Sequence, residues 1–391
     1  MTIARYDPYA PDALDNPYPV YAWLREEAPL YLQPDYGFAV VSRYEDVVSV
    51  ARNPQDFSSA KGIGPAVAED TRNMIEMDPP DHTRLRRLVQ KAFTPRTIAL
   101  LEDRIREICN ELLDEFVGAG RCDFMTDFAT PLPVRVIAEM LGVEPERMGD
   151  FKRWSDTVVD ALVADPKTMD KETYIPTLRE MNGYFRSIVE ARKADPRDDL
   201  TTALVQAREE RDALSDVEIL GSMLLLLVAG NETTTNLIGN GTLAISSDED
   251  QRRLVRGDPS LWPNVVEEIL RFDGPIQGFF RTTTRDVEMH GNTIPANTKV
   301  LVLWGSADRD PARYPDPDRF DVTRDASGHV AFGSGIHLCL GAPLARLEGR
   351  IAIETVVGRI QNLKVEGKPT RRPNPFFRGF EHLPITFEPS S

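Results

Sequence analysis

The stretch FGSGIHLCLG, residues 332–341, decides how the chain folds around its functional centre, because it gathers three glycines and a histidine about one cysteine. Glycine loses the most conformational freedom on folding, so three within ten residues indicate a backbone that bends sharply or approaches another group closely. The next residues, APLARLEGRIAIETVVGRI, have a helical pattern. Cys339 is therefore expected to face a helix N-terminus, where exposed N–H groups favour a thiolate.

A thiolate at this position is a soft ligand for iron, zinc or copper. Zinc would need three further ligands, and the sequence offers no clustered set of them, since the four histidines other than His337 are widely scattered at 82, 290, 329 and 382. A single thiolate suffices as the axial ligand of haem iron. Gly333, Gly335 and Gly341 would then let the loop lie flat against a macrocycle and aim N–H groups at the sulfur.

Composition and charge are those of a globular protein. The 391 residues are 41% hydrophobic and 28% charged, with a net charge of −16 that disfavours nucleic acid as a partner. The N-terminus has no signal-peptide pattern, and the longest apolar run, ILGSMLLLLVAG (219–230), is too short to span a bilayer. Cys109 and Cys122 lie outside any motif and are interpreted as small buried hydrophobes. We expect a cytoplasmic protein that does not enter a membrane.

Hydrophobic periodicity predicts a mainly α fold with a smaller β region, in one domain over residues 1–391. Helices are expected over about 81–275 and 340–361, and the β-rich portions at about 29–60, 276–305 and 363–389. Residues 29–42 form a predicted hairpin, 260–272 a helix, and "TKVLVLWGSA" (298–307) a β-type segment. Ser215 and Glu218 form a capping box that opens the helix carrying the apolar run.

The pattern Phe332-x-x-Gly335-x-x-x-Cys339-x-Gly341 resembles the haem-binding signature of the cytochrome P-450 family. Further signatures occur in the family's order, so the resemblance covers most of the chain. It implies the cytochrome P-450 fold, with haem b buried between the long central helix and the helix that follows the cysteine loop, and Cys339 as the iron ligand. Phe332, Gly333 and Gly341 are implied haem contacts.

A second signature is AGNETTT, residues 229–235, within the apolar helix. Ala229 and Gly230 remove bulk so that a ligand can lie against the helix. Glu232 and Thr233 add a carboxylate and a hydroxyl, and Thr233 can bond back to the carbonyl four residues earlier. Taken alone, these residues are equally compatible with a helix that has reached solvent. The family resemblance implies instead the oxygen-activating acid–alcohol pair, with Ala229 and Gly230 against the haem.

Two further sets of residues are assigned through the resemblance. Glu268 and Arg271 share a helix face and match a structural triad whose third member would be Arg319, holding the loop beneath the thiolate side of the haem. The basic side chains matching the propionate contacts of the family are His82, Arg86, Arg281 and His337.

An electron donor is implied as well. Residues 82–101 contain Arg84, Arg86, Arg87, Lys91 and Arg96 with no acid. With Arg346 and Arg350 they would form a cationic patch that steers an iron–sulfur ferredoxin, reduced in turn by an NAD(P)H-dependent reductase. A solvated helix face is the simpler interpretation of such a patch.

The substrate pocket is predicted by analogy from the 58–78 loop, the helix near 225–230, and segments 275–280 and 374–380. The residues expected to line it are Leu225, Ile276, Phe279, Phe280, Phe376 and Phe377. They favour a small hydrophobic substrate, aromatic ones included, which reacts with O2 by hydroxylation or O-dealkylation. Terpenoids, steroids and fatty acids stay open, as do a peroxide-driven oxidase and a haem-thiolate ligand sensor.

Overall fold

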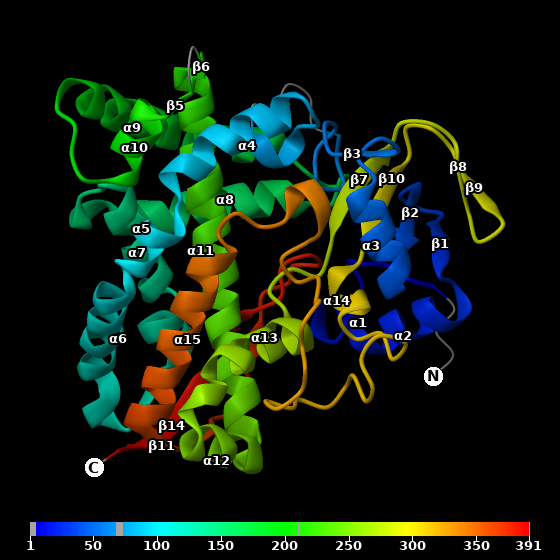
Figure 1. Ribbon diagram of the computed structural model, residues 1–391. Helices are drawn as coiled ribbons and strands as arrows, with labels where there is room; N and C mark the ends of the chain where they lie inside the picture. Colours follow the sequence, from blue (N-terminus) through cyan, green and yellow to red (C-terminus); the bar gives the residue numbers. More distant parts are fainter. Residues whose placement is uncertain (1–4, 68–72, 210–211, 391) are drawn as a thin grey trace.

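A helix of 32 residues, α11 (Asp216–Ser247), runs through the centre of the helical part of the protein (Figure 1). The computed structural model describes residues 5–67, 73–209 and 212–390. The predicted capping box is confirmed: the Ser215 hydroxyl accepts from the Glu218 N–H, and the Glu218 carboxylate accepts from the Ser215 N–H. Among the described residues, α11 alone is long and apolar enough to cross a membrane, but half of the relevant window is buried inside the protein.

Other helices pack around α11 and enclose most of its length. Its neighbours in contact are α7, α8, α9, α13 and α15, and α6 lies against the outer side of α15 and α7. These helices span Glu102–Phe116 (α6), Pro131–Leu141 (α7), Met148–Val163 (α8), Ile175–Ala194 (α9), Trp262–Asp273 (α13) and Ala342–Arg359 (α15). The remaining helices of this part are α4 (Asp81–Ala92), α5 (Pro95–Ala99), α10 (Leu200–Gln206) and α12 (Glu249–Gly257).

A five-stranded sheet lies beside the helical part, in the order β1-β2-β10-β7-β3 (Figure 1). The predicted hairpin is confirmed as β1 and β2, which pair antiparallel. The strands are β1 (Leu30–Gln33), β2 (Phe38–Val41), β3 (Phe57–Ser58), β7 (Phe279–Thr283) and β10 (Lys299–Val302). Short helices flank this sheet: α1 (Pro11–Asp15), α2 (Tyr18–Glu27), α3 (Tyr44–Arg52) and α14 (Trp304–Ala307).

The remaining strands form small sheets. They are β4 (Arg121–Asp123), β11 (Ile360–Val365) and β14 (Pro384–Pro389) in one sheet, and the pairs β5 (Arg208–Glu209) with β6 (Asp212–Ala213), β8 (Val287–Met289) with β9 (Asn292–Ile294), and β12 (Thr370–Arg371) with β13 (Phe380–His382).

The segment 298–307 is β-type only in its first half. β10 ends at Val302, and residues 304–307 form the short helix α14, with Trp304 and Ala307 packed into the core beneath the sheet. The expected strand over the whole segment was therefore wrong, because Gly305, Ser306 and Ala307 bring little β propensity and the chain turns to bury Trp304.

Candidate active site

The cysteine loop approaches another helix so closely that glycine is required. Gly335 has φ +72°, and a Cβ built on it would lie 2.7 Å from the carbonyl oxygen of Ala51 in α3. Gly333 also has a left-handed φ of +75°, which residues other than glycine rarely adopt. The Cys339 N–H donates to the carbonyl of Phe332 at 2.9 Å and closes the loop. The predicted bent backbone is thus present.

Cys339 lies at the N-terminus of α15, as expected. Burial raises the pKa of its thiol, while the N–H groups of Gly341 and Ala342 and the guanidinium of Arg86 lower it. These donors favour the thiolate required of a metal ligand. Burial raises the pKa of all three thiols, to about 12 for Cys109 inside α6 and for Cys122 on β4, and of the three only Cys339 lies at a helix N-terminus. Cys339 is the thiol whose surroundings suit coordination.

Three of the predicted propionate ligands gather near the cysteine loop. The rings of His82 and His337 have centroids 4.3 Å apart. Both ring nitrogens of His82 and Nε2 of His337 are buried and meet no hydrogen-bond partner among the described residues. Burial, with Arg281, His82 and Arg86 nearby, lowers the pKa of His337 to about 3. Burial likewise lowers the pKa of Arg281 to about 10, although Asp78 opposes the shift. Such a cluster calls for an anion.

Arg86, the fourth predicted propionate ligand, contacts the backbone of the cysteine loop. Its Nη1 donates to the carbonyl of Ile336 at 3.1 Å and its Nη2 to the carbonyl of Leu338 at 2.6 Å. The guanidinium therefore links α4 to the cysteine loop, and its positive charge acts to lower the pKa of the Cys339 thiol. A guanidinium has five N–H donors, so these two bonds leave capacity for a carboxylate of the ligand.

These observations fit a haem. The Cys339 sulfur, which has two backbone N–H donors, matches the iron of such a ligand. The separate cluster of unpartnered imidazole nitrogens beside the buried Arg281 guanidinium matches its propionates. The residues that would hold it are Cys339, His82, Arg281 and His337. Within the described residues there is no group of three or more His, Cys, Asp or Glu side chains that could hold a metal ion alone.

The acid–alcohol pair lies in the buried middle of α11. Glu232 is 4% exposed, so the alternative of a helix that has reached solvent does not apply. The Thr233 hydroxyl donates to the Ala229 carbonyl at 2.6 Å, which is the predicted back-bond. Leu225, Ala229 and Thr233, spaced by four residues, share one face of the helix. Ala229 is exposed on that face and Gly230 is half-buried.

Two of the six predicted pocket residues are wrong. Phe280 is fully buried and packs edge-on against Phe38 and Phe376, with ring centroids 5.2 and 5.4 Å away. Phe376 in turn packs against Tyr9. Alternation along β7 explains the error, because it places Phe279 on the face of Arg281 and Phe280 on the opposite face, in the core.

Of the other four predicted pocket residues, Phe377 is buried in the same core cluster as Phe280 and Phe376, while Leu225, Ile276 and Phe279 are partly buried. Phe279 and Phe377 face each other with centroids 5.8 Å apart. Ile276 forms an isolated bridge with Phe377, and Leu225 is half-buried on α11. Residues 68–72 of the predicted 58–78 loop lie outside the described residues.

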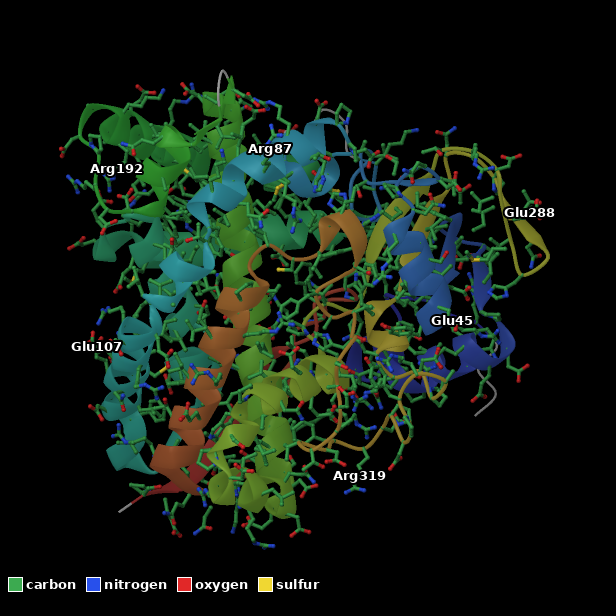
Figure 2. The ribbon with its side chains drawn as sticks, viewed as in Figure 1. Glu45, Arg87, Glu107, Arg192, Glu288 and Arg319 are labelled. Atoms are coloured by element: carbon green, nitrogen blue, oxygen red, sulfur yellow. The ribbon has the colours of Figure 1, made fainter. Side chains whose placement is uncertain are left out.

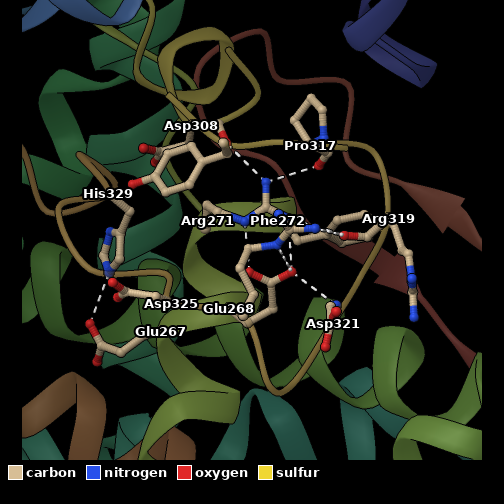
Figure 3. A network of polar contacts seen from close by, with 12 residues as sticks. Glu267, Glu268, Arg271, Phe272, Asp308, Pro317, Arg319, Asp321, Asp325 and His329 are labelled. Atoms are coloured by element: carbon tan, nitrogen blue, oxygen red, sulfur yellow. Dashed lines mark hydrogen bonds and ion pairs between the residues drawn. The ribbon is translucent and has the colours of Figure 1, made fainter. Parts of the chain in front are cut away.

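The structural triad has a different third member from the one predicted. Figure 3 shows its first two members, Glu268 and Arg271, with Arg319 beside them. Arg271 donates Nε to Glu268 at 2.6 Å, and both side chains are fully buried. The second cation is Arg324, whose Nε lies 3.2 Å from Glu268 Oε1. Arg319 contributes its backbone carbonyl, which accepts from Arg271 and Arg324, while its side chain is exposed. Arg319 was wrong because the sequence gives no sign of how the loop folds back over its own length.

The expected cationic patch is partly neutralised within the chain. Arg84 pairs with Asp212 and Glu218, Arg346 with Glu267, and Arg350 with Glu102 and Glu354. Arg87, which Figure 2 shows on the outer side of α4, and Lys91 are exposed. The side chain of Arg96 lies outside the described residues. Any patch on the exposed side of α4 includes Arg87 and Lys91.

Sequence reasoning missed Arg324, Arg372 and Asp156. Arg324 completes the triad, and Arg372 and Asp156 reach Glu232 or its partner. No motif surrounds these three residues, and each is distant in sequence from the group it contacts, so only the fold brings them into view.

Comparison with known proteins places this geometry in a family. A family model described as cytochrome P450 matches residues 260–388. The chain is 41% identical to the vitamin D(3) 25-hydroxylase of Pseudonocardia autotrophica, covering 99% of this chain and 98% of the relative. The structure of cytochrome P450 CYP109Q5 from Chondromyces apiculatus is 40% identical, with a TM-score of 0.91 and complete coverage of both chains. CYP109E1 from Bacillus megaterium, solved in complex with testosterone, is 35% identical, with a TM-score of 0.85 over 95% of this chain and 99% of that one.

Proposed function

This chain belongs to the cytochrome P450 family, and on that premise we propose that it inserts one atom of O2 into a hydrophobic organic substrate, with electrons from NAD(P)H delivered through a reductase and an iron–sulfur ferredoxin. The observation that supports this most is the acid–alcohol pair on α11, with Glu232 buried and Thr233 half-buried, in the same protein as a cysteine at a helix N-terminus. We place the protein in the cytoplasm, where thiols stay reduced.

The residues that would bind the haem and those that would handle the proton lie in different parts of the site. When bound, haem b supplies the oxidising chemistry, and a thiolate ligand favours O–O cleavage. Cys339 would hold the iron, and His82, Arg281 and His337 would hold the propionates. The buried Glu232 carboxylate would first take up a proton from water and then pass it on, and the Thr233 hydroxyl oxygen would accept a hydrogen bond and orient the transfer. The Leu225–Ala229 face and Phe279 would exclude water.

Steroid-sized substrates gain support over small aromatic ones. The vitamin D(3) hydroxylase and the testosterone complex are named for polycyclic lipids, and the expected aromatic wall is reduced because Phe280 and Phe376 belong to the core. The small aromatic substrate stays a second candidate through Phe279 and Phe377.

A spectral titration tests this assignment. The haem-loaded protein is titrated with testosterone and, separately, with 4-methoxybenzoate, and the iron spin state is followed by absorption. We expect testosterone to produce a saturable spin-state change at lower concentration. A response to neither compound, or to the benzoate alone, would contradict the steroid assignment. Turnover with ferredoxin that exceeds turnover with peroxide alone would separate a monooxygenase from a peroxide-driven oxidase.

A ligand sensor is separated by a variant. A sensor would need Cys339 but not the acid–alcohol pair, so replacing Thr233 would leave its ligand response intact. A sensor would also form no product, even as the parent protein. Product formation by the parent protein with O2 and a reductant excludes the sensor.

A further inference from the structure

Both carboxylate oxygens of Glu232 are held by neighbours. Asn236, one turn along α11, donates Nδ2 to Oε1 at 3.3 Å. Arg372, far away in sequence, donates Nη1 to Oε2 at 3.1 Å. Since Glu232 is 4% exposed, these contacts replace the water that a carboxylate would otherwise bind. The orientation of this acid is thus set by side chains from two different parts of the fold.

Arg372 is shared between Glu232 and a second helix. The same Nη1 atom lies 3.1 Å from Oδ1 of Asp156, and Nη2 lies 3.8 Å from Asp160, both on α8. Arg372 itself follows β12, and its own N–H donates to the Gly379 carbonyl across the hairpin. One guanidinium therefore joins α11, α8 and the C-terminal hairpin.

The Arg372 guanidinium is surrounded by more negative than positive side chains. Burial lowers the pKa of Arg372, but Glu232, Asp156 and Asp160 together raise it well above the ordinary value, so the cation is permanent. Lys152 pairs with Asp156 at 2.6 Å and supplies a second cation that does not reach Glu232. Burial raises the pKa of Asp160, with Arg372 opposing the shift. Asp156 and Glu232 thus share one guanidinium nitrogen, whose two hydrogens can serve one carboxylate each.

We propose that Arg372 is a positioning residue whose cation pairs with the Glu232 carboxylate and orients it for proton transfer, and that Asp156 tunes this pairing through the same guanidinium nitrogen. The inference rests on the proposed role of Glu232 as a proton relay. It follows from the energetics of burial: a carboxylate enclosed without a cation is driven toward its neutral form. Asn236 can orient Glu232 but brings no charge.

A direct test measures the protonation of Glu232 in the haem-loaded protein by infrared difference spectroscopy during a pH titration. The carbonyl stretch of the protonated acid is assigned by its loss in Glu232→Gln. In Arg372→Met we expect this band to appear at higher pH than in the parent protein, by about one pH unit or more. In Arg372→Lys, which restores the charge, the midpoint should return most of the way.

Two further variants test the direction of the midpoint shift and provide a control. Asp156→Asn leaves Arg372 to Glu232 and should move the midpoint to lower pH. Lys152→Met removes a cation from the same cluster without touching Glu232 and should shift the midpoint less than Arg372→Met does. An unchanged midpoint in both Arg372→Met and Asp156→Asn would overturn the proposal. If Arg372→Met fails to fold, Arg372→Lys and Asp156→Asn decide alone.

The role of Glu232 is tested separately. With testosterone as the probe and a plant-type ferredoxin as the donor, the yield of product per NADPH should fall in Glu232→Gln and in Arg372→Met and recover in Arg372→Lys. If Glu232→Gln leaves the yield unchanged, the proton relay fails as a function, while the infrared midpoints still decide whether Arg372 controls the acid.

Discussion

At the scale of single residues, the functional argument depends on polar groups buried where an apolar helix would otherwise continue. Glu232 and Thr233 occupy the middle of α11, and their neighbours on the shared face, Leu225 and Ala229, are apolar. A hydroxyl that already donates to the Ala229 carbonyl can accept a hydrogen bond from elsewhere through its lone pairs. This is the arrangement expected if the pair passes a proton, as we propose.

The first prediction concerns Thr233. Thr233→Ala removes the hydroxyl and should lower product per NAD(P)H by about tenfold or more, with peroxide released instead, since positioned proton transfer contributes on the order of a hundredfold or more. Thr233→Ser keeps the hydroxyl and serves as the control. Product and peroxide are measured on the same samples. Full coupling in Thr233→Ala would remove this residue from the mechanism.

A second prediction concerns Glu348, a fully buried acid on α15 whose pKa is raised to about 8 by burial. Because the unfolded carboxyl titrates near 4.5, the folded state holds an extra proton between these values, and the free energy of unfolding falls as pH rises through this window. Glu348→Gln stays neutral and should stabilise the protein by about 2–4 kcal/mol above the window, with little change below it.

Thermal unfolding at acidic and alkaline pH checks this prediction. Glu366→Gln, at an exposed site, is the matched control and should show no gain that depends on pH. A gain of equal size for Glu348→Gln at both pH values would argue against a buried neutral acid.

At the scale of elements, the Glu268 network joins α13 to the loop that precedes the cysteine segment. Glu268 accepts from Arg271, from Arg324 and from the Asp321 N–H, and Arg271 also donates to the carbonyls of Asp308 and Pro317. Breaking such a buried set leaves an uncompensated charge. The loop is therefore held by one helix face.

The third prediction separates Arg324 from Arg319. Arg324→Ala removes a charged hydrogen bond to a fully buried carboxylate and should lower the free energy of unfolding by about 1–3 kcal/mol. Arg319→Ala removes only an exposed side chain, visible at the lower edge of Figure 2, and should change it by less than about 0.5 kcal/mol. Denaturant unfolding of both variants provides the comparison, and equal losses would restore the original assignment.

The contrast between these arginines shows where prediction from sequence ends. Local patterns were sufficient for the α11 capping box, the β1–β2 hairpin and the turn before Cys339, because each depends on neighbouring residues. The assignments that failed, Arg319 and Phe280, came from the family resemblance and not from a local pattern. The face of a strand that meets the core, and the fold of a loop of irregular backbone, are decided by tertiary packing.

At the scale of the whole molecule, the distribution of charge bears on the electron donor. A net charge of −16 would repel an acidic ferredoxin, so an attractive region has to be local. Arg84, Arg346 and Arg350 are paired within the chain. Arg87 and Lys91 are exposed cations on α4, close in sequence to the Arg86 that binds the cysteine loop.

The fourth prediction reverses these charges. The double variant Arg87→Glu and Lys91→Glu should slow reduction by ferredoxin, and the effect should be larger at low salt, where screening is weak. Arg253→Glu changes an exposed arginine on α12, which Figure 1 places at the opposite end of the molecule from α4, and should leave the rate unchanged. Stopped-flow reduction at two ionic strengths measures both, and identical rates would end the steering hypothesis.

The central claim is that the Cys339 thiolate binds the iron of a haem, and the carbon monoxide difference spectrum of the reduced protein tests it most directly. We predict a Soret band displaced far to the red, as thiolate coordination produces, in the parent protein, and its loss in Cys339→Ser. A haem-loaded parent protein whose band stays at the position of histidine-ligated haem, or a protein that takes up no haem, would contradict the account.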